Sequence, residues 1–144
     1  MLRGKGYTEF VPYYRTKRRW SDRTKVVEIP LFAGYVFCRF DPNDRLPILQ
    51  TPGVVDVVRF GQDFIPVDER EIESIGSIVN SGAEVTPWPY LREGQRVRIR
   101  GGALDRVEGI LIDFRNGRRI VVSITILQRS VAAELDRADV EPIL

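Results

Sequence analysis

The stretch Gly94–Leu111, "GQRVRIRGGALDRVEGIL", decides the fold of the C-terminal third of this 144-residue chain. Arginines occupy every second position from 96 to 100, with β-branched residues between them. This alternation predicts a strand with one buried and one solvent-facing side. Gly102 follows that strand, where the chain turns and a positive φ is expected. Gly109 lies inside the next apolar run, where a glycine marks a bend, a bulge or the close approach of another backbone.

The sequence after Gly109 predicts β-structure throughout. "FRNGRR" places Asn116-Gly117 between two β-branched runs, which is typical of a two-residue hairpin turn. "RIVVSITIL" and "RSVAAEL" predict two further strands, and "ADVEPI" predicts a short last one. Five short strands in about 50 residues are typical of a small barrel.

The N-terminal part mixes strands and helices. "YTEFVPYY" and "TKVVEIPLF" flank the polar "RTKRRWSDR", which predicts a hairpin with a basic tip. Two more strands are predicted over Tyr35–Phe40 and Val54–Phe60, with a short helix between them that Asp44 caps. Asp68 and Glu71 have capping-box spacing, and the helix that they begin ends at Gly82.

The domain boundary is predicted after that helix. "AEVTPWPY" contains two prolines and predicts a linker over residues 83–90. The expected domains are therefore residues 1–82 and 91–144.

Composition restricts the chemistry. There is no histidine, which removes the commonest general base and metal ligand. The single cysteine, Cys38, allows neither an intramolecular disulfide nor a cysteine-based zinc site. No nucleophile and base converge in the sequence, so we predict a protein that is not an enzyme and uses no cofactor or metal. No apolar run approaches the roughly 20 residues of a membrane helix, and no signal peptide is visible. We therefore expect a cytoplasmic protein with no membrane partner.

Charge is concentrated at one end of the chain. Residues 1–27 hold eight basic and two acidic residues, so their net charge is +6. The whole chain has a net charge of +2. This asymmetry predicts an anionic partner for that end, although a solvated loop is an alternative reading. Basic side chains next to an aromatic ring suit phosphate attraction combined with base stacking. The predicted nucleic-acid-binding residues are Arg15, Lys17, Arg18, Arg19 and Trp20.

The glycines and apolar positions of the opening stretch resemble the KOW motif. They are Gly94, Val97, Ile99, Gly102, Gly109 and Leu111. Upstream, "PLFAGYVFCRF" and "TPGVVDVVRFG" resemble the N-terminal domain of the NusG family, which includes its specialised relative RfaH. The resemblance covers nearly the whole chain. It implies an α+β fold: a ferredoxin-like N-terminal domain that lacks its first strand and helix, followed by a five-stranded SH3-like barrel. "MLRGKGY" resembles the end of the lacking helix.

The resemblance also implies a function in transcription elongation and antitermination. The N-terminal domain would bind RNA polymerase, with non-template DNA or nascent RNA nearby, and the KOW domain would recruit a small-subunit ribosomal protein or Rho. The polymerase-facing positions are Leu31, Phe32, Tyr35, Phe37, Thr51, Pro52 and Gly53. Strand-core packing is an alternative for Tyr35 and Phe37, and an ordinary turn is an alternative for the last three. Ala33 stands where relatives commonly have proline.

In the KOW domain, the positions that would contact the partner are Ile126, Leu127 and Arg129. Alternatively, Ile126 folds inward. Without the first family strand, the two strands around it would have unpaired edges, so we expect the chain to form a homodimer or to rearrange. A structural RNA-binding KOW protein of the ribosome is the alternative function. The net charge of −4 over residues 28–144 and the upstream "LFAGYVF" argue against it.

Overall fold

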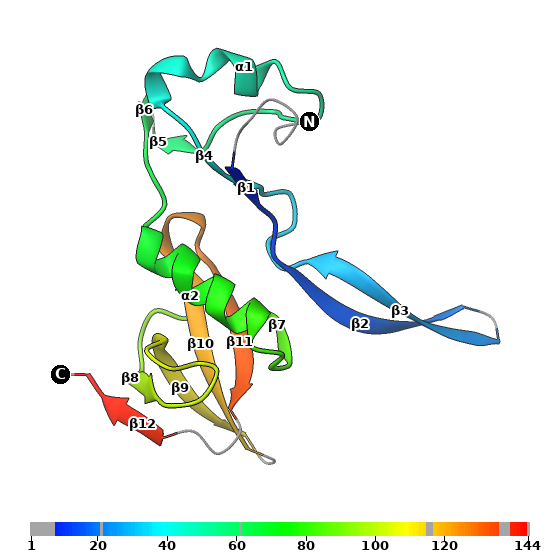
Figure 1. The fold of residues 1–144 in the computed structure, drawn as a ribbon, viewed down its shortest axis with the longest axis vertical. Helices are drawn as coiled ribbons and strands as arrows, with labels where there is room; N and C mark the ends of the chain where they lie inside the picture. The colour runs from blue at the N-terminus through cyan, green and yellow to red at the C-terminus, as the bar shows by residue number, and fades with distance from the viewer. Residues whose placement is uncertain (1–7, 21, 61, 115–116, 136–138, 144) are drawn as a thin grey trace. The chain divides into compact units, whose positions relative to one another are not determined.

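The computed structural model describes residues 8–20, 22–60, 62–114, 117–135 and 139–143 (Figure 1). The chain divides into two compact units. One consists of Met1–Val11 and Gly34–Pro66, and the other of Pro12–Ala33 and Val67–Leu144. The units do not follow chain order, because the basic hairpin segment groups with the C-terminal part.

A six-stranded antiparallel sheet dominates the second unit, with strand order β12-β8-β9-β10-β11-β7. The strands are β7 (Val85–Trp88), β8 (Gln95–Arg100), β9 (Glu108–Phe114), β10 (Gly117–Ile124), β11 (Arg129–Leu135) and β12 (Asp139–Pro142). The five strands predicted in this region are present. Their closure into an SH3-like barrel stays a prediction.

The sixth strand corrects the predicted linker. β7 lies within residues 83–90 and pairs with β11, placing Pro87 opposite Val131 and Trp88 opposite Ser130. Proline cannot donate a ladder hydrogen bond, but an edge strand tolerates it because one side of the strand is unpaired. β7 stands at the end of the strand order. The two prolines therefore indicate an edge strand here, and the segment belongs to the sheet.

The core of this sheet forms from the alternation seen in the sequence. Val97, Ile99 and Ile120 are fully buried. At Gly109, an added Cβ would lie 2.5 Å from the Val121 carbonyl oxygen and 2.7 Å from Ile120 Cγ1. Of the three alternatives that the sequence left open for this glycine, the structure shows the close approach of another backbone. Gly102 has the expected positive φ of 74°.

The hairpin between β9 and β10 forms in a register that differs from the prediction. Gly117 pairs with Phe114 as the first residue of β10, so it does not occupy a central turn position. Asn116, the other residue of the predicted turn, lies outside the described residues. Since Gly117 has φ 147°, a glycine still suits the position.

Helix α2 (Glu69–Asn80) begins and ends where the sequence predicts. The Asp68 carboxylate accepts a hydrogen bond from the Arg70 backbone N–H at 2.9 Å. Gly82 follows the helix with φ 79°. Ile75 and Ile78 are fully buried on the face that packs toward β10.

The predicted basic hairpin is also present, and its strands are longer than expected. β2 (Tyr13–Trp20) and β3 (Arg23–Pro30) pair along eight residues each and form a separate two-stranded sheet. The polar stretch expected at the tip is thus mostly strand. Ser21, part of the predicted turn, lies outside the described residues.

The first unit contains only short elements. β1 (Thr8–Phe10) pairs with β4 (Phe37–Arg39), and β5 (Arg59–Phe60) pairs with β6 (Asp63–Phe64). The strands predicted over residues 35–40 and 54–60 are therefore shorter than expected, and Val55 is 98% exposed. The ferredoxin-like arrangement stays a prediction, and "MLRGKGY" lies outside the described residues.

The helical segment between β4 and β5 is broken in two. The 3-10 turn η2 (Pro42–Asp44) precedes helix α1 (Leu46–Leu49). Asp41 caps η2 by accepting from the Asn43 backbone N–H at 2.9 Å. The prediction that Asp44 caps the helix is wrong, because Asp44 lies inside η2 and α1 has no side-chain cap. Within the described part of the chain, no helix is long and apolar enough to cross a membrane.

Candidate nucleic-acid and protein interfaces

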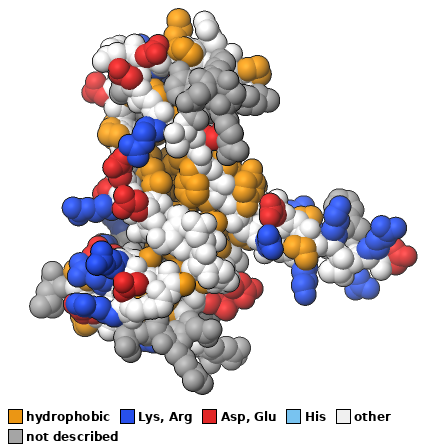
Figure 2. All heavy atoms as spheres, in the orientation of Figure 1, with side chains coloured by type: hydrophobic (Ala, Val, Ile, Leu, Met, Phe, Trp, Pro, Cys, Tyr) orange, Lys and Arg blue, Asp and Glu red, His pale blue; other side chains and the backbone are white. Residues whose placement is uncertain are grey.

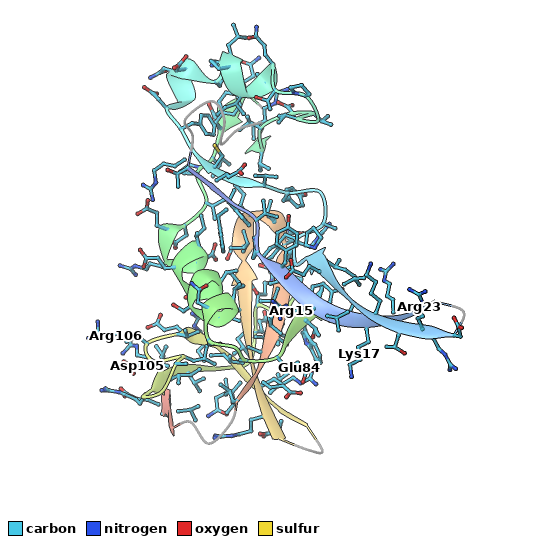
Figure 3. All side chains as sticks on the ribbon, turned by 45° about the vertical axis from the view of Figure 1, so that its right-hand side comes forward. Arg15, Lys17, Arg23, Glu84, Asp105 and Arg106 are labelled. Carbon is cyan, nitrogen blue, oxygen red and sulfur yellow. The ribbon has the colours of Figure 1, made fainter. Side chains whose placement is uncertain are left out.

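The β2–β3 hairpin brings most of the predicted nucleic-acid-binding residues together. Arg15, Lys17, Arg18 and Arg19 all lie on β2 with exposed side chains. Trp20 ends the same strand, and its side chain lies outside the described part of the structure. Figure 2 shows Lys and Arg side chains gathered along the hairpin, and Figure 3 labels Arg15 and Lys17 on β2 and Arg23 on β3.

The strand register distinguishes these cations. Arg15 lies opposite Glu28, and its Nε is 3.4 Å from Glu28 Oε1. Arg18 lies directly opposite another cation, Lys25. Like charges in directly opposed positions destabilise a strand pair. The charge of Arg15 is therefore partly neutralised within the hairpin by Glu28. Arg18 and Lys25, by contrast, repel each other across the strand pair.

Two basic residues of β3 escaped the sequence analysis. Arg23 pairs with Trp20, and Lys25 pairs with Arg18, and both side chains are exposed. These two residues become part of the site only when β2 and β3 are paired along their whole length. The pairing then places Arg23 opposite Trp20 and Lys25 opposite Arg18. The sequence predicted a loop over part of β2, and a loop gives no such pairing.

The predicted polymerase-facing aromatic strip is mostly buried in the structure. Leu31, Phe32 and Phe37 are 5%, 2% and 7% exposed. Phe37 packs against Phe10, with ring centroids 6.1 Å apart. Tyr35 is half-buried. Of the two alternatives left open by the sequence, Phe37 thus takes the core position, and Tyr35 retains accessible surface.

The second predicted polymerase contact, residues 51–53, forms a turn after α1. The Thr51 side chain is 3% exposed, and its hydroxyl donates to the Pro47 carbonyl at 2.9 Å. Pro52 and Gly53 are exposed, and Gly53 has φ 89°. Thr51 therefore anchors the turn, while the next two residues face solvent.

The predicted KOW partner site lies at the tip between β10 and β11. There the chain forms the 3-10 turn η3 (Thr125–Leu127), followed by Gln128 in the left-handed conformation at φ 51°. Leu127 is buried at 8% exposure, Ile126 is half-buried and Arg129 is exposed. Leu127 therefore belongs to the core, and Arg129 is the most accessible of the three predicted residues.

Helix α2 reaches the same tip through Glu71. Its carboxylate accepts hydrogen bonds from the Thr125 backbone N–H at 3.2 Å and from the Thr125 hydroxyl at 2.5 Å. Glu71 thus caps η3, rather than its own helix as the capping-box spacing predicted. The 54-residue separation between the partners explains why sequence spacing could not find this contact.

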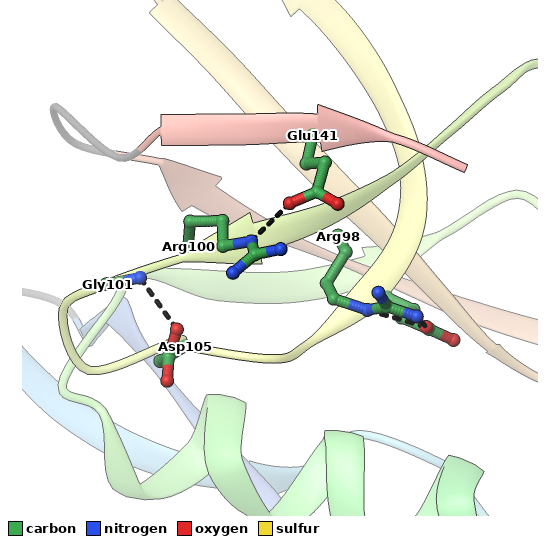
Figure 4. A network of polar contacts seen from close by, with 6 residues as sticks. Arg98, Arg100, Gly101, Asp105 and Glu141 are labelled. Carbon is green, nitrogen blue, oxygen red and sulfur yellow. Dashed lines mark hydrogen bonds and ion pairs between the residues drawn. The ribbon is translucent and has the colours of Figure 1, made fainter.

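Two of the three arginines of β8 are engaged in ion pairs (Figure 4). Arg98 binds Glu108 and Arg100 binds Glu141. The hydrogen bond from Arg100 lowers the pKa of Glu141 below its usual range, and the same bond raises the pKa of Arg100. The arginine alternation at residues 96–100 is therefore the solvent-facing side of a strand, and acidic neighbours balance Arg98 and Arg100.

Cys38 offers little reactivity. It is half-buried in β4, and burial, followed by the negative charge of Glu9, raises the pKa of its thiol. The thiol is thus protonated and poorly nucleophilic at neutral pH. Among the described residues, no group of three or more His, Cys, Asp and Glu side chains is arranged to hold a metal ion.

These features define an α+β protein that combines an antiparallel β module with an exposed basic hairpin. The sequence model of the family described as "Transcription termination factor nusG" matches residues 1–76. Because this match covers more than half of the chain, the protein belongs to the NusG family.

Similarity to individual proteins extends into the C-terminal sheet. A protein from Borreliella burgdorferi is 26% identical over 145 residues, covering 92% of this chain and 78% of that protein. One from Campylobacter jejuni is 28% identical over 127 residues, covering 86% and 72%. One from Helicobacter pylori is 26% identical over the same length. All three are named transcription termination/antitermination protein NusG. No solved structure matches the chain significantly.

Proposed function

We propose that this protein is a cytoplasmic transcription elongation and antitermination factor that binds RNA polymerase through its N-terminal part. The observation that supports this most strongly is the family match over residues 1–76, joined to relatives that cover 86% or more of the chain. A match of this extent includes both the "LFAGYVF" segment and the KOW-like segment. The function is therefore proposed for the chain as a whole.

Within the proposed polymerase site, the residues divide by burial. Tyr35, Pro52 and Gly53 retain accessible surface and are proposed as direct contacts. Phe37 and Thr51, from the same unit, are buried and are proposed to hold that surface in shape. Leu31 and Phe32 are buried in the other unit and stay candidate contacts. A half-buried aromatic side chain suits a partner helix because it contributes a large apolar area at low entropic cost.

Binding to purified bacterial core RNA polymerase tests this proposal. A photo-crosslinking amino acid at Tyr35 is expected to capture a polymerase subunit, whereas one at the exposed Gln95 of β8 is not. Pause lifetimes on a defined template are expected to change when the protein is added. No crosslink at Tyr35 and no change in pausing would contradict the proposal.

The C-terminal sheet is proposed to recruit the second partner through its β10–β11 tip. Arg129 and the half-buried Ile126 supply the accessible surface, and Leu127 supports them from the core. The partner is a small-subunit ribosomal protein or Rho. The isotope-labelled protein is titrated separately with the ribosomal protein and with Rho, and its amide NMR signals are followed. One of the two partners is expected to shift the signals of residues 125–129. If ribosomal particles are captured from lysate without polymerase, the ribosomal alternative is correct instead.

The hairpin is proposed to contact nucleic acid beside the polymerase, either non-template DNA or nascent RNA. Its exposed Lys and Arg side chains support this proposal.

Self-association is proposed separately, because Val55 and Val36 leave apolar surface uncovered at 98% and 51% exposure. Light scattering during size-exclusion chromatography is expected to report a homodimer. A monodisperse monomer at all concentrations would contradict it.

A further inference from the structure

We propose that the β2–β3 hairpin enters a groove of duplex DNA and places cations against the phosphates of both groove walls. This inference rests on the nucleic-acid role proposed above for the hairpin, and it specifies the form of nucleic acid and the mode of contact. It adds Arg23 and Lys25 to the site.

The first argument is the distribution of cations over the two faces of the ribbon. Successive residues of a strand point to opposite faces, so Arg15, Lys17 and Arg19 share one face. The paired positions that carry Arg18, Lys25 and Arg23 share the other. Contact with a flat surface or with a single strand requires cations on one face only. A ribbon that is basic on both faces suits a site with phosphates on both sides.

The second argument is the absence of internal compensation on one face. Glu28 is the only acidic residue within β2 and β3, and it lies on the face of Arg15. The other face holds the opposed pair Arg18 and Lys25, whose Cβ atoms in such a pair lie about 5 Å apart. For the residues that the structure describes, no ion pair is found at either side chain. An external anion between them would relieve this repulsion.

The third argument is size. Strands in a pair lie about 4.8 Å apart, and the major groove of B-DNA, about 12 Å wide, admits a two-stranded ribbon. Cations two residues apart on a strand are separated by about 6.8 Å. A row of three thus spans about 14 Å, comparable with four steps between successive phosphates along one strand at about 3.4 Å each. The major groove of duplex RNA is too narrow for side chains to read, so the geometry favours duplex DNA.

Phosphate contacts of this kind predict binding without sequence preference. They also predict a steep dependence on salt, because each neutralised phosphate releases counterions and contributes about −0.9 to the slope of log K against log salt. With about five cations engaged, we expect a slope between about −4 and −5.

The test uses the full chain and fluorescence anisotropy. The probes are a short mixed-sequence DNA duplex, the same DNA as a single strand, and the matching RNA duplex, each titrated from about 50 to 200 mM salt. Two double variants remove cations from one face each: Lys17→Ala with Arg19→Ala, and Arg18→Ala with Lys25→Ala. The matched control, Arg92→Ala with Arg96→Ala, removes the same charge from exposed positions outside the hairpin.

Each hairpin variant is expected to weaken duplex DNA binding on the order of tenfold at about 0.1 M salt and to reduce the slope by about 1.8. The control is expected to retain both values, and circular dichroism is expected to be unchanged because all substituted side chains are exposed. If only one face matters, or if single-stranded DNA or duplex RNA binds more tightly than duplex DNA, the groove model is overturned while the nucleic-acid role survives. If no nucleic acid binds, both fail. The polymerase proposal is unaffected, since this assay contains no polymerase.

Discussion

Two segments rich in β-branched residues differ in burial: one is buried in a sheet and the other is largely exposed. "RIVVS" in the six-stranded sheet and "VVDVV" in the first unit both predict a strand. In β10, Ile120, Val121 and Val122 are buried at 0%, 2% and 4% exposure. In the first unit, Val55 and Val58 are 98% and 38% exposed. The difference lies in neighbours: β10 pairs with β9 on one side and β11 on the other, whereas residues 54–58 belong to no strand in the described structure. A pattern of β-branched residues predicts an extended chain, but burial requires partners.

The largest test of this comparison removes one apolar side chain from each segment. Ile120→Ala is expected to lower the free energy of unfolding by about 3 kcal/mol, because Ile120 is fully buried and its truncation leaves a cavity. Val55→Ala is expected to change it by less than about 0.5 kcal/mol, as is usual for an exposed position. Urea denaturation followed by circular dichroism measures both. Equal losses in the monomer would contradict the exposure of Val55. A loss at Val55 that appears only at high protein concentration would instead fit the proposed homodimer.

A second test compares two glycines in the unit that holds the sheet. Gly109→Ala is expected to cost about 2 kcal/mol or more, since the new Cβ would collide with the Val121 carbonyl oxygen at 2.5 Å. Gly76→Ala in α2 is expected to stabilise the protein by about 0.5 to 1 kcal/mol, because nothing lies within 4 Å of the added Cβ and alanine favours the helix. The same urea experiment applies. A tolerated alanine at Gly109 would mean that β9 and β10 approach less closely than described.

A third test concerns how the sheet acquires its helix. A double-mutant cycle of Glu71→Ala and Thr125→Val is expected to give a coupling energy of about 1 kcal/mol, comparable with a helix cap. The reason is that Thr125→Val removes the hydroxyl that donates to the Glu71 carboxylate, while the backbone N–H of residue 125 keeps its own hydrogen bond to Glu71. A matched cycle of Glu73→Ala and Thr125→Val should give none. Additive losses in the first cycle would contradict the hydrogen bond from the Thr125 hydroxyl to Glu71.

The same comparison explains what the sequence could predict. Local pattern predicts the strands after Gly94 and the cap of α2 by Asp68, and the structure has both. At Gly109 the pattern left three alternatives, of which the structure shows the close backbone approach. The strand over residues 54–58 failed because propensity does not supply a neighbouring strand. β7 was missed because proline was taken as a break, whereas an edge strand accommodates it.

The candidate sites follow the same division. The basic residues of β2 could be predicted because charge follows directly from residue type. The side chains of these residues that the structure describes are exposed. Arg23 and Lys25 required the ladder register. The sequence left the burial of Phe37 open as an alternative and gave no sign of the burial of Phe32, because an aromatic residue has the same sequence signature in a core as on a surface.

The smallest effect is expected at the exposed pair formed by Arg100 and Glu141 at the edge of the sheet. Because the hydrogen bond from Arg100 lowers the pKa of Glu141 in the folded state, the carboxylate stabilises the fold at pH values above its ordinary pKa of 4.5. This contribution is lost as the pH falls below 4.5 and through the lowered pKa. Glu141→Gln should therefore lower the thermal midpoint slightly at neutral pH and make it less sensitive to acid, with Glu73→Gln on α2 as the control.

The effect at Glu141 is expected to be small because solvent and salt screen exposed ion pairs. Thermal melts at low and high salt measure this screening directly, since added salt should bring the midpoint of the unsubstituted protein toward that of Glu141→Gln. If the difference persisted at high salt, the pair would contribute through the pairing of β12 with β8 rather than through charge. The edge of the sheet would then depend on specific side-chain geometry, as its core does at Gly109.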